Sequence, residues 1–413
     1  MDNVTHALAG MLLAEAVVHS LTPAGARPNP GFRRAAWLAS AVANNFPDLD
    51  FLYRRITPGK IGYLLHHRGH THTLLVAVVL GALTFFGVRW LSRRLGAHLD
   101  RRQEGALLGL SLVGGWIHIG MDLSNNYGVH PLWPLYDGWF YGDAIFIIEP
   151  WFWLLTVPPL FLAAERRVAK IVLALIPVVG IGLAWVTSLA GLGTALTLTA
   201  GAALSAFGAY KLSPRARALA AIGASLAVVA VFSTGSHLAA ASVRTAEAGL
   251  RTATADYVAT PAPANPLCWN VISVGEHAGF YELRVATVSI APSLVTAAAC
   301  GVEPTGKTAG LRAAELPNSP GVAWEGVWRA PLAELRTLAR ERCDVAAFLR
   351  YARVPFWLER PAGELLVGDL RYDRAPDAEF AEIELPGKVG ACPEWLPPWR
   401  PPRAALLESG AAR

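Results

Sequence analysis

Charged side chains are scarce in this sequence of 413 residues. Asp, Glu, Lys and Arg make up 16% of it, whereas hydrophobic residues make up 53%. Soluble globular domains carry about 25% charged residues. The composition excludes a disordered chain, because so much apolar surface has to be buried. Long apolar runs also argue against a single soluble globule.

Lysine is rarer still, with five of the 36 basic residues. The net charge of +5 therefore comes from arginine, and the arginines gather in short loops between apolar runs. The positive-inside rule predicts this distribution for the cytoplasmic loops of a membrane protein. We expect a lipid bilayer as partner, and no nucleic acid.

Cysteine is absent from the first 249 residues and occurs four times afterwards, with no CxxC spacing that would indicate a zinc ribbon. Residues 250–413 also hold 36 of the 67 charged side chains. We predict a helical membrane domain over residues 1–249 and a water-exposed domain over 250–413. The cysteines there form disulfides in one of three pairings, or stay buried thiols; they are Cys268, Cys300, Cys343 and Cys392.

A membrane-spanning helix needs about 20 mainly apolar residues. Six runs are predicted as spans: 74–91, 105–121, 144–164, 171–190, 193–210 and 218–241. Two shorter stretches, 7–21 and 35–46, are predicted to be half-buried, re-entrant or packed inside the bundle. Asp2 stands where a signal peptide carries basic residues, so we expect no cleavable signal.

The arginine-rich loops predict an orientation. Placing the basic loops around residues 89–102, 166–170 and 211–217 in the cytoplasm makes the spans alternate consistently. Residues 66–72, 122–143 and everything after 241 then face outward, where disulfides persist. We predict a multi-pass protein with an extracytoplasmic C-terminal domain.

That C-terminal domain has strand-like and helix-like segments. Residues 281–290, 365–372 and 380–385 are rich in β-branched residues or alternate in hydrophobicity. Residues 332–350 have helical spacing. The predicted fold is therefore mainly α, with a smaller β-rich α+β domain that ends in a loose Pro- and Arg-rich tail from residue 397.

Polar side chains cluster beside the apolar runs, where their burial is costly. His118 and Asp122 are four residues apart, so a helix places both on one face, where they can share a divalent ion. A His–Asp hydrogen bond that joins two helices is the alternative. Asp48 and Asp50 follow a proline and can bind one ion or bridge two. The alternative for them is a helix cap or a turn.

Four histidines crowd into residues 66–72. Neutral imidazoles bind zinc at about 2.0–2.1 Å, and Gly69 permits the sharp backbone that would direct several rings inward, although one ion cannot take all four. Arg68 would repel a cation, so we expect it to face an anion such as phosphate or a carboxylate. A surface loop without function is the alternative.

Five blocks, taken in order, resemble a bacterial family classed as inner-membrane, metal-dependent hydrolases, whose best-known members are regulated by LexA. The resemblance covers about residues 1–160, with Thr73 in place of the usual Ser and Glu149 in place of the usual Asp. A more distant likeness is to zinc-dependent phospholipase C and P1-type nucleases. The blocks are Met1-Asp2-x-x-Thr5-His6, Pro47-Asp48-Leu49-Asp50, His67-Arg68-Gly69-x-Thr71-His72, His118-x-x-x-Asp122 with Asn126-Tyr127-Gly128, and Asp143 to Pro150.

The resemblance implies a protein of the bacterial inner membrane with a divalent-metal centre. The residues themselves indicate one to three ions. The mixed His and Asp donors favour zinc. The predicted ligands are His6, Asp48, Asp50, His67, His72, His118 and Asp122. Arg68 would stabilise anionic charge, Asp50 would act at the metal centre, and Asp143 or Glu149 would orient a ligand histidine.

The predicted function is hydrolysis of a phosphoester or lipid-linked substrate by metal-activated water. An amphiphilic or phosphate-containing molecule is the expected substrate. A structural metal site with a binding C-terminal domain is the main alternative. Ion transport is a third, and it would favour charged residues spread through several spans rather than crowded at one side.

Overall fold

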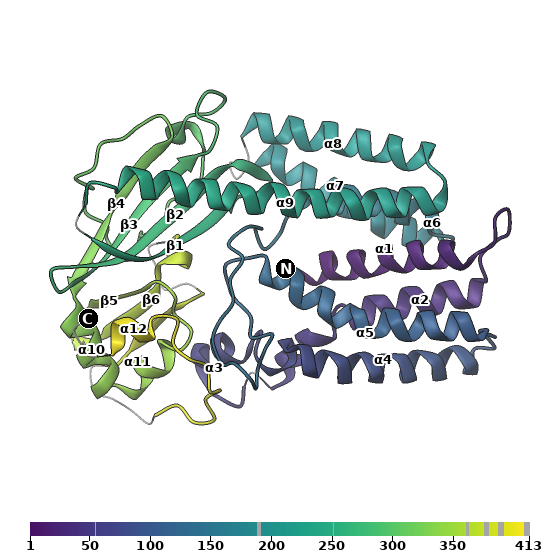
Figure 1. The fold of residues 1–413 in the computed structure, drawn as a ribbon, viewed down its shortest axis with the longest axis horizontal. Coiled ribbons are helices and arrows are strands. Elements are labelled where there is room, and N and C mark those ends of the chain that lie inside the picture. Colours follow the sequence, from purple (N-terminus) through teal and green to yellow (C-terminus); the bar gives the residue numbers. More distant parts are fainter. Residues whose placement is uncertain are drawn as a thin grey trace.

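A computed structural model describes residues 1–53, 55–187, 191–250, 252–360, 363–375, 380–386 and 392–408. Helices make up most of the first 246 residues, and two antiparallel sheets with short helices follow (Figure 1). The predicted fold class is confirmed: a mainly helical membrane part precedes a smaller part that contains the sheets.

Six of the described helices are long and apolar enough to cross a membrane. They are α1 (Asn3–Leu21), α4 (Leu74–Arg94), α5 (Arg101–Leu123), α7 (Arg167–Val186), α8 (Leu192–Lys211) and α9 (Pro214–Ala246). The shorter helices α2 (Pro30–Ala43) and α6 (Pro150–Ala163) pack among them.

One predicted span and one of the two shorter stretches differ from the helices that form. The run 144–164 becomes helical only at Pro150, because proline suits the first helical turn and the Glu149 side chain accepts a hydrogen bond there from the Trp151 N–H. The stretch 7–21 belongs to a complete candidate span, since Asp2 caps α1 at Asn3. Residues 188–190 of the run 171–190 lie outside the described residues.

The arginine-rich loops gather at one end of the bundle, and the sheets lie at the other end (Figure 1). The connections α1–α2, α4–α5, α6–α7 and α8–α9 are all at the end away from the sheets. This arrangement is the alternation of spans that the positions of the arginines predicted.

The first sheet contains β1 (Ala253–Ala262), β2 (Asn265–His277), β3 (Phe280–Ser289) and β4 (Val322–Pro331), in that order. The second contains β5 (Pro355–Glu359), β6 (Leu365–Asp369) and β7 (Glu382–Leu385). The short helices are α10 (Leu332–Glu341), α11 (Cys343–Phe348) and α12 (Ala404–Leu407).

The expected strands 281–290, 365–372 and 380–385 correspond to β3, β6 and β7. The helix expected over 332–350 is two helices, because Arg342 has an extended backbone between them. The cysteines form two disulfides, Cys268–Cys300 and Cys343–Cys392. Strands β1, β2, β4 and β5 were not predicted.

Helix α9 connects the bundle to the first sheet. Its 33 residues extend for about 50 Å, more than the hydrocarbon thickness of about 30 Å. Phe232, Ala239 and Val243 on α9 share one apolar core with Trp269 and Val271 of β2. The sheet is therefore packed onto the end of this helix rather than joined by a free linker.

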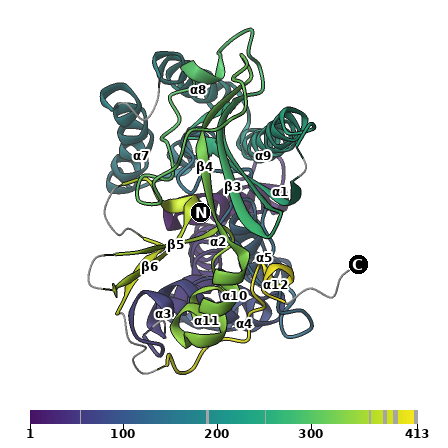
Figure 2. The same cartoon turned by 90° about the vertical axis from the view of Figure 1, so that its left-hand side faces the viewer.

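The second sheet and helices α10–α12 cover the loops at the same end of the bundle (Figure 2). Leu64 and Leu65 of α3 (Gly59–His66) belong to one core with Phe348 and Tyr351. The sheet part thus completes its core with residues that precede it by almost 300 positions.

The C-terminal segment expected to be loose from residue 397 is packed as far as it is described. Trp399 is 1% exposed, and its Nε1–H donates to the Leu65 carbonyl at 2.7 Å. The Arg403 guanidinium donates to Asp256. Burial of the indole outweighs the local preference of prolines and arginines for solvent; residues 409–413 lie outside the described part.

Candidate metal centre

Four of the predicted ligands converge at the end of the bundle that faces the sheets. They are Asp48 on the 3₁₀ turn Phe46–Leu52, His72 just before α4, and His118 and Asp122 on α5. Each offers one ligand atom within 4.8 Å of the other three. His72, His118 and Asp122 are at most 1% exposed.

The spacing of these ligand atoms fits a single cation. The Nε2 atoms of His72 and His118 are 3.0 Å apart. His72 Nε2 lies 3.4 and 3.3 Å from carboxylate oxygens of Asp48 and Asp122, and His118 Nε2 lies 3.6 and 3.4 Å from them. Four ligands at about 2.0 Å from a tetrahedral zinc would be about 3.3 Å apart. The donors present therefore fit a divalent ion.

The backbone and a carboxylate orient the two histidines. His118 Nδ1 lies 2.6 Å from the Asn44 carbonyl, so it carries the proton and leaves Nε2 unprotonated toward the cluster. His72 Nδ1 lies 3.4 Å from Asp50, an acceptor that favours the same tautomer. This is the state in which an imidazole binds a metal.

The predicted ligand Asp50 belongs to a second, adjoining group with Asp48 and His67. His67 Nδ1 lies 3.3 Å from Asp50 Oδ1, and the Arg68 N–H donates to Asp50 Oδ2 at 2.7 Å. Because Asp48 belongs to both groups, the described residues could hold one ion or two, with Asp48 between them.

The protonation states of Asp48 and His67 suit cation binding. Burial alone would raise the pKa of Asp48, but hydrogen bonds from the Nε2 atoms of His118 and His72 in the metal-free site hold that pKa well below its usual range. A bound cation would take the place of those Nε2 protons. Burial lowers the pKa of His67, although Asp50 opposes this shift. Asp48 is therefore a carboxylate and His67 a neutral imidazole at neutral pH.

His6, also predicted as a ligand, lies beside the cluster but in neither group. Its ring stacks on that of His118 with centroids 3.8 Å apart, and its Nε2 is 3.3 Å from Asp122 Oδ1. These contacts support the positions of His118 and Asp122.

Arg68 faces a carboxylate, as its sequence position predicted. Its Nε lies 3.0 Å from Asp122 Oδ2, and one terminal nitrogen donates to Asn125 at 2.8 Å. Its φ of 58° is unusual for a residue with a side chain and is the strained point of the loop. Gly69, which was expected to provide the sharp backbone of this loop, has a negative φ. A glycine is still needed at this position, because a Cβ would lie 2.8 Å from the His66 carbonyl oxygen.

The other two histidines of the 66–72 run point away from the cluster. His66 Nε2 lies 3.0 Å from the Thr57 hydroxyl. His70 packs against the rings of Trp133 and Trp399. The run is therefore divided between the metal centre and the core of the sheet part.

The structure places Asp143 and Glu149 away from the role predicted for them. Asp143 is bound by Arg353, at 2.6 Å. Glu149 caps α6 and also accepts a hydrogen bond from the Ala264 N–H. Among the described residues, neither contacts a ligand histidine. Both instead connect the bundle to the sheet part.

Glu149→Gln should stabilise the protein increasingly as the pH rises. Burial raises the pKa of Glu149 to about 8, above about 4.3 in an unfolded chain. The stability due to its protonated form is therefore complete below about pH 4 and is lost as the pH passes 8. We expect the variant's gain in melting temperature over the wild type to grow by a few degrees between pH 5 and 8.5. Thermal unfolding in detergent measures it.

A suitable control is Glu165→Gln, because Glu165 is 61% exposed. Its effect on the melting temperature should be the same at both pH values. A gain for Glu149→Gln that does not change with pH would contradict the expectation.

Sequence reasoning missed the residues that position the ligands. Asn125 holds Arg68, and the Asn44 carbonyl orients His118. Both asparagines lie within polar blocks visible in the sequence, but nothing local indicates which residue each one contacts.

Residues 1–192 match the family profile described as YdjM inner membrane protein. This stretch includes every residue of the two ligand groups and ends before the sheets. No curated protein and no solved structure matches the chain. The likeness to phospholipase C and P1-type nucleases therefore remains a prediction.

Proposed function

We propose that this protein is a metal-dependent hydrolase of the inner membrane that cleaves a phosphoester in an amphiphilic substrate. The observation that carries the proposal is a set of four buried candidate ligands from three separate segments, Asp48, His72, His118 and Asp122, whose ligand atoms lie within 4.8 Å of one another. The match of residues 1–192 to an inner-membrane family and the six candidate spans support the membrane location.

A divalent cation in this site would supply the Lewis acidity that makes hydroxide available near neutral pH. Asp50 fixes the ring of His72, and Arg68 holds the carboxylate of Asp122. His67 Nδ1–H donates a hydrogen bond to Asp50, which leaves the unprotonated Nε2 able to accept a proton from water. If the second ligand group is used, His67 would instead hold a second ion.

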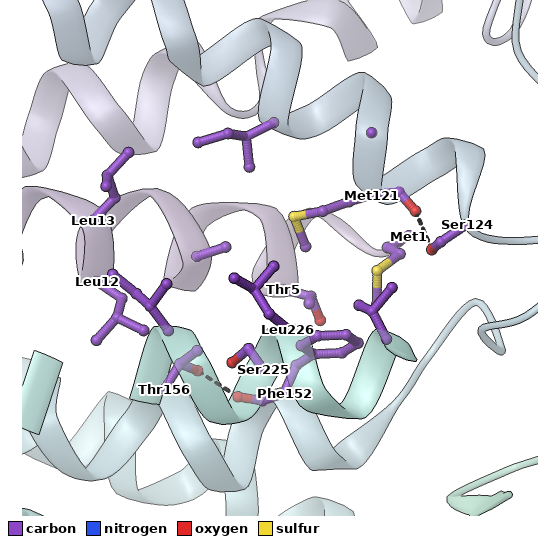
Figure 3. Close-up of a pocket in the computed structure, with 15 residues that line it drawn as sticks. Met1, Thr5, Leu12, Leu13, Met121, Ser124, Phe152, Thr156, Ser225 and Leu226 are labelled. Atoms are coloured by element: carbon purple, nitrogen blue, oxygen red, sulfur yellow. Dashed lines mark hydrogen bonds between the residues drawn. The ribbon is translucent and has the colours of Figure 1, made fainter. Parts of the chain in front are cut away.

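An apolar pocket of about 340 Å³ lies between α1, α5, α6 and α9 (Figure 3). Met1, Met121, Phe152 and Leu226 point into it. Met1 lines the pocket, and its backbone nitrogen contacts the candidate ligand Asp122. The pocket is therefore next to the cluster. A hydrocarbon chain matches an apolar pocket among spanning helices, which supports an amphiphilic substrate.

The proposed orientation puts the metal centre and the sheets outside the cytoplasm. Arginine-rich loops at the opposite end of the bundle support this assignment. The two disulfides in the sheet part support it independently, since an oxidising compartment preserves them.

The proposal is tested with detergent-purified full-length protein, whose bound metals are measured before and after treatment with a chelator. We expect one or two divalent ions per chain and hydrolysis of phospholipid or lipid-linked phosphate. Chelation should abolish hydrolysis and added zinc should restore it. Long-chain substrates should be cleaved faster than short-chain analogues, because only they reach the apolar pocket.

If the metal-loaded protein cleaves no phosphoester, the hydrolase proposal is wrong. If the metal is bound and its removal only unfolds the protein, the site is structural. Equal rates for long-chain and short-chain substrates would remove the role of the apolar pocket.

A further inference from the structure

A second pocket, of about 320 Å³, adjoins the metal centre and is built from both parts of the chain. The bundle contributes His67, Arg68 and Asn126, and the sheet part contributes Thr260, Tyr372 and Arg374. The two sides are joined directly, since the Asn126 side chain donates to the Thr260 hydroxyl at 2.6 Å. A molecule that approaches His67 through this pocket therefore meets residues of both parts.

The Arg374 guanidinium in this pocket lacks a charged partner within the described part of the chain. Its Nε is buried and has no hydrogen-bond partner among the described residues. Arg374 also forms no ion pair with any residue that the structure describes. Its guanidinium lies 5.8 Å from the centre of the Phe146 ring. A buried donor without an acceptor costs about 1–3 kcal/mol, so a ligand that accepts a hydrogen bond would stabilise this arrangement.

Asp373 and Arg371 hold the backbone just before Arg374. Asp373 accepts hydrogen bonds from the N–H groups of Thr308 and Ala309 at 2.7 and 2.8 Å. Arg371 pairs with Asp369 and also donates to the Asn126 carbonyl, on the bundle side of the pocket. The segment just before Arg374 is therefore held by contacts with both parts of the chain.

The other arginine of the pocket is already neutralised. Arg68 is bound to Asp122 and Asn125, as described above. A planar guanidinium with free donors is suited to phosphate, which it can bind through two parallel hydrogen bonds. The side chains of Ile145, Phe146 and Phe380 give the pocket an apolar wall as well.

We propose that Arg374 binds the anionic phosphate group of the substrate, opposite the metal ligands, so that the sheet part completes the substrate site. The choice of a phosphoester substrate rests on the proposed function, whereas anion binding at Arg374 does not require hydrolysis. The family match ends at residue 192, so this role belongs to the part of the chain outside that match.

The test compares Arg374→Gln and Arg374→Lys with Arg329→Gln. Arg329 is a matched control, because its guanidinium also lies over a phenylalanine ring, that of Phe280, but it does not line the pocket. Binding of inorganic phosphate is measured calorimetrically on full-length protein, both metal-loaded and metal-stripped, together with the metal content. Where hydrolysis is detected, KM and kcat are also measured.

We expect Arg374→Gln to weaken phosphate binding at least tenfold with unchanged metal content, and Arg374→Lys to weaken it less. KM should rise more than kcat falls, and Arg329→Gln should behave as the wild type does. If Arg374→Gln binds phosphate as tightly as the wild type, or if the wild type does not bind phosphate, the inference is overturned. Phosphate binding that depends on Arg374 in a protein without hydrolase activity would uphold it and refute only the proposed function.

Discussion

His72→Ala should remove the bound metal and lower kcat/KM for hydrolysis by about a thousandfold, on the order of 4 kcal/mol of transition-state stabilisation. His72 contributes an Nε2 that is 3.0–3.4 Å from each of the other three ligand atoms. Its loss opens the ligand set and leaves Asp48 and Asp122 facing each other without a cation. Metal analysis and kinetics on the purified variant measure both effects.

His70→Ala is the matched control, because His70 lies in the same run but packs against Trp133 and Trp399. This variant should lose some stability and keep its metal and its activity. A His72→Ala protein with full metal content and wild-type kcat/KM would show that the cluster is not the metal centre. If both variants lost metal equally, the loop as a whole rather than the His72 imidazole would be responsible.

Asp369→Asn should lower the free energy of unfolding by about 3–5 kcal/mol, the cost of leaving a buried charge without its partner. Asp369 and Arg371 are fully buried and form two hydrogen bonds of 2.9 and 2.7 Å. Arg371 also donates to the Asn126 carbonyl, so the loss should loosen the sheet part from the bundle. Chemical denaturation in detergent measures the change.

Asp344→Asn offers a control with the same two-residue spacing. Arg342 and Asp344 also form two hydrogen bonds, but their side chains are 10% and 13% exposed. Water can replace part of that interaction, so we expect a cost of about 1 kcal/mol. Equal costs for the two substitutions would show that burial does not set the strength of the Asp369–Arg371 pair. Asp369→Asn should also weaken phosphate binding, since Arg371 helps to fix the position of Arg374.

The ligand set also shows how far local spacing predicts a site. His118 and Asp122 share a face of α5 because they are four residues apart, and the structure brings them together as expected. Asp48 follows Pro47 in a short turn and also reaches the cluster. These positions follow from backbone geometry over a few residues, which a sequence specifies directly.

For other polar residues, the sequence indicated that burial is costly but did not indicate which residues they contact. Asp143 binds Arg353, 210 positions further along the chain, rather than a residue of the metal centre. His66 and His70 face the sheet part, while His67 and His72 face the cluster. A histidine-rich run does not specify which rings turn inward, because that depends on what packs against each side of the loop.

By itself the sequence determined the helical membrane part, its arginine-rich end and most of the candidate ligand residues. Those features depend on hydropathy over about 20 residues, on charge distribution and on helical spacing, all of which are local. Only the tertiary structure decided that Trp399 anchors the C-terminal segment and that Arg374 reaches the pocket of His67. Such pairings join residues hundreds of positions apart, and the burial of a shared core selects them rather than any local pattern.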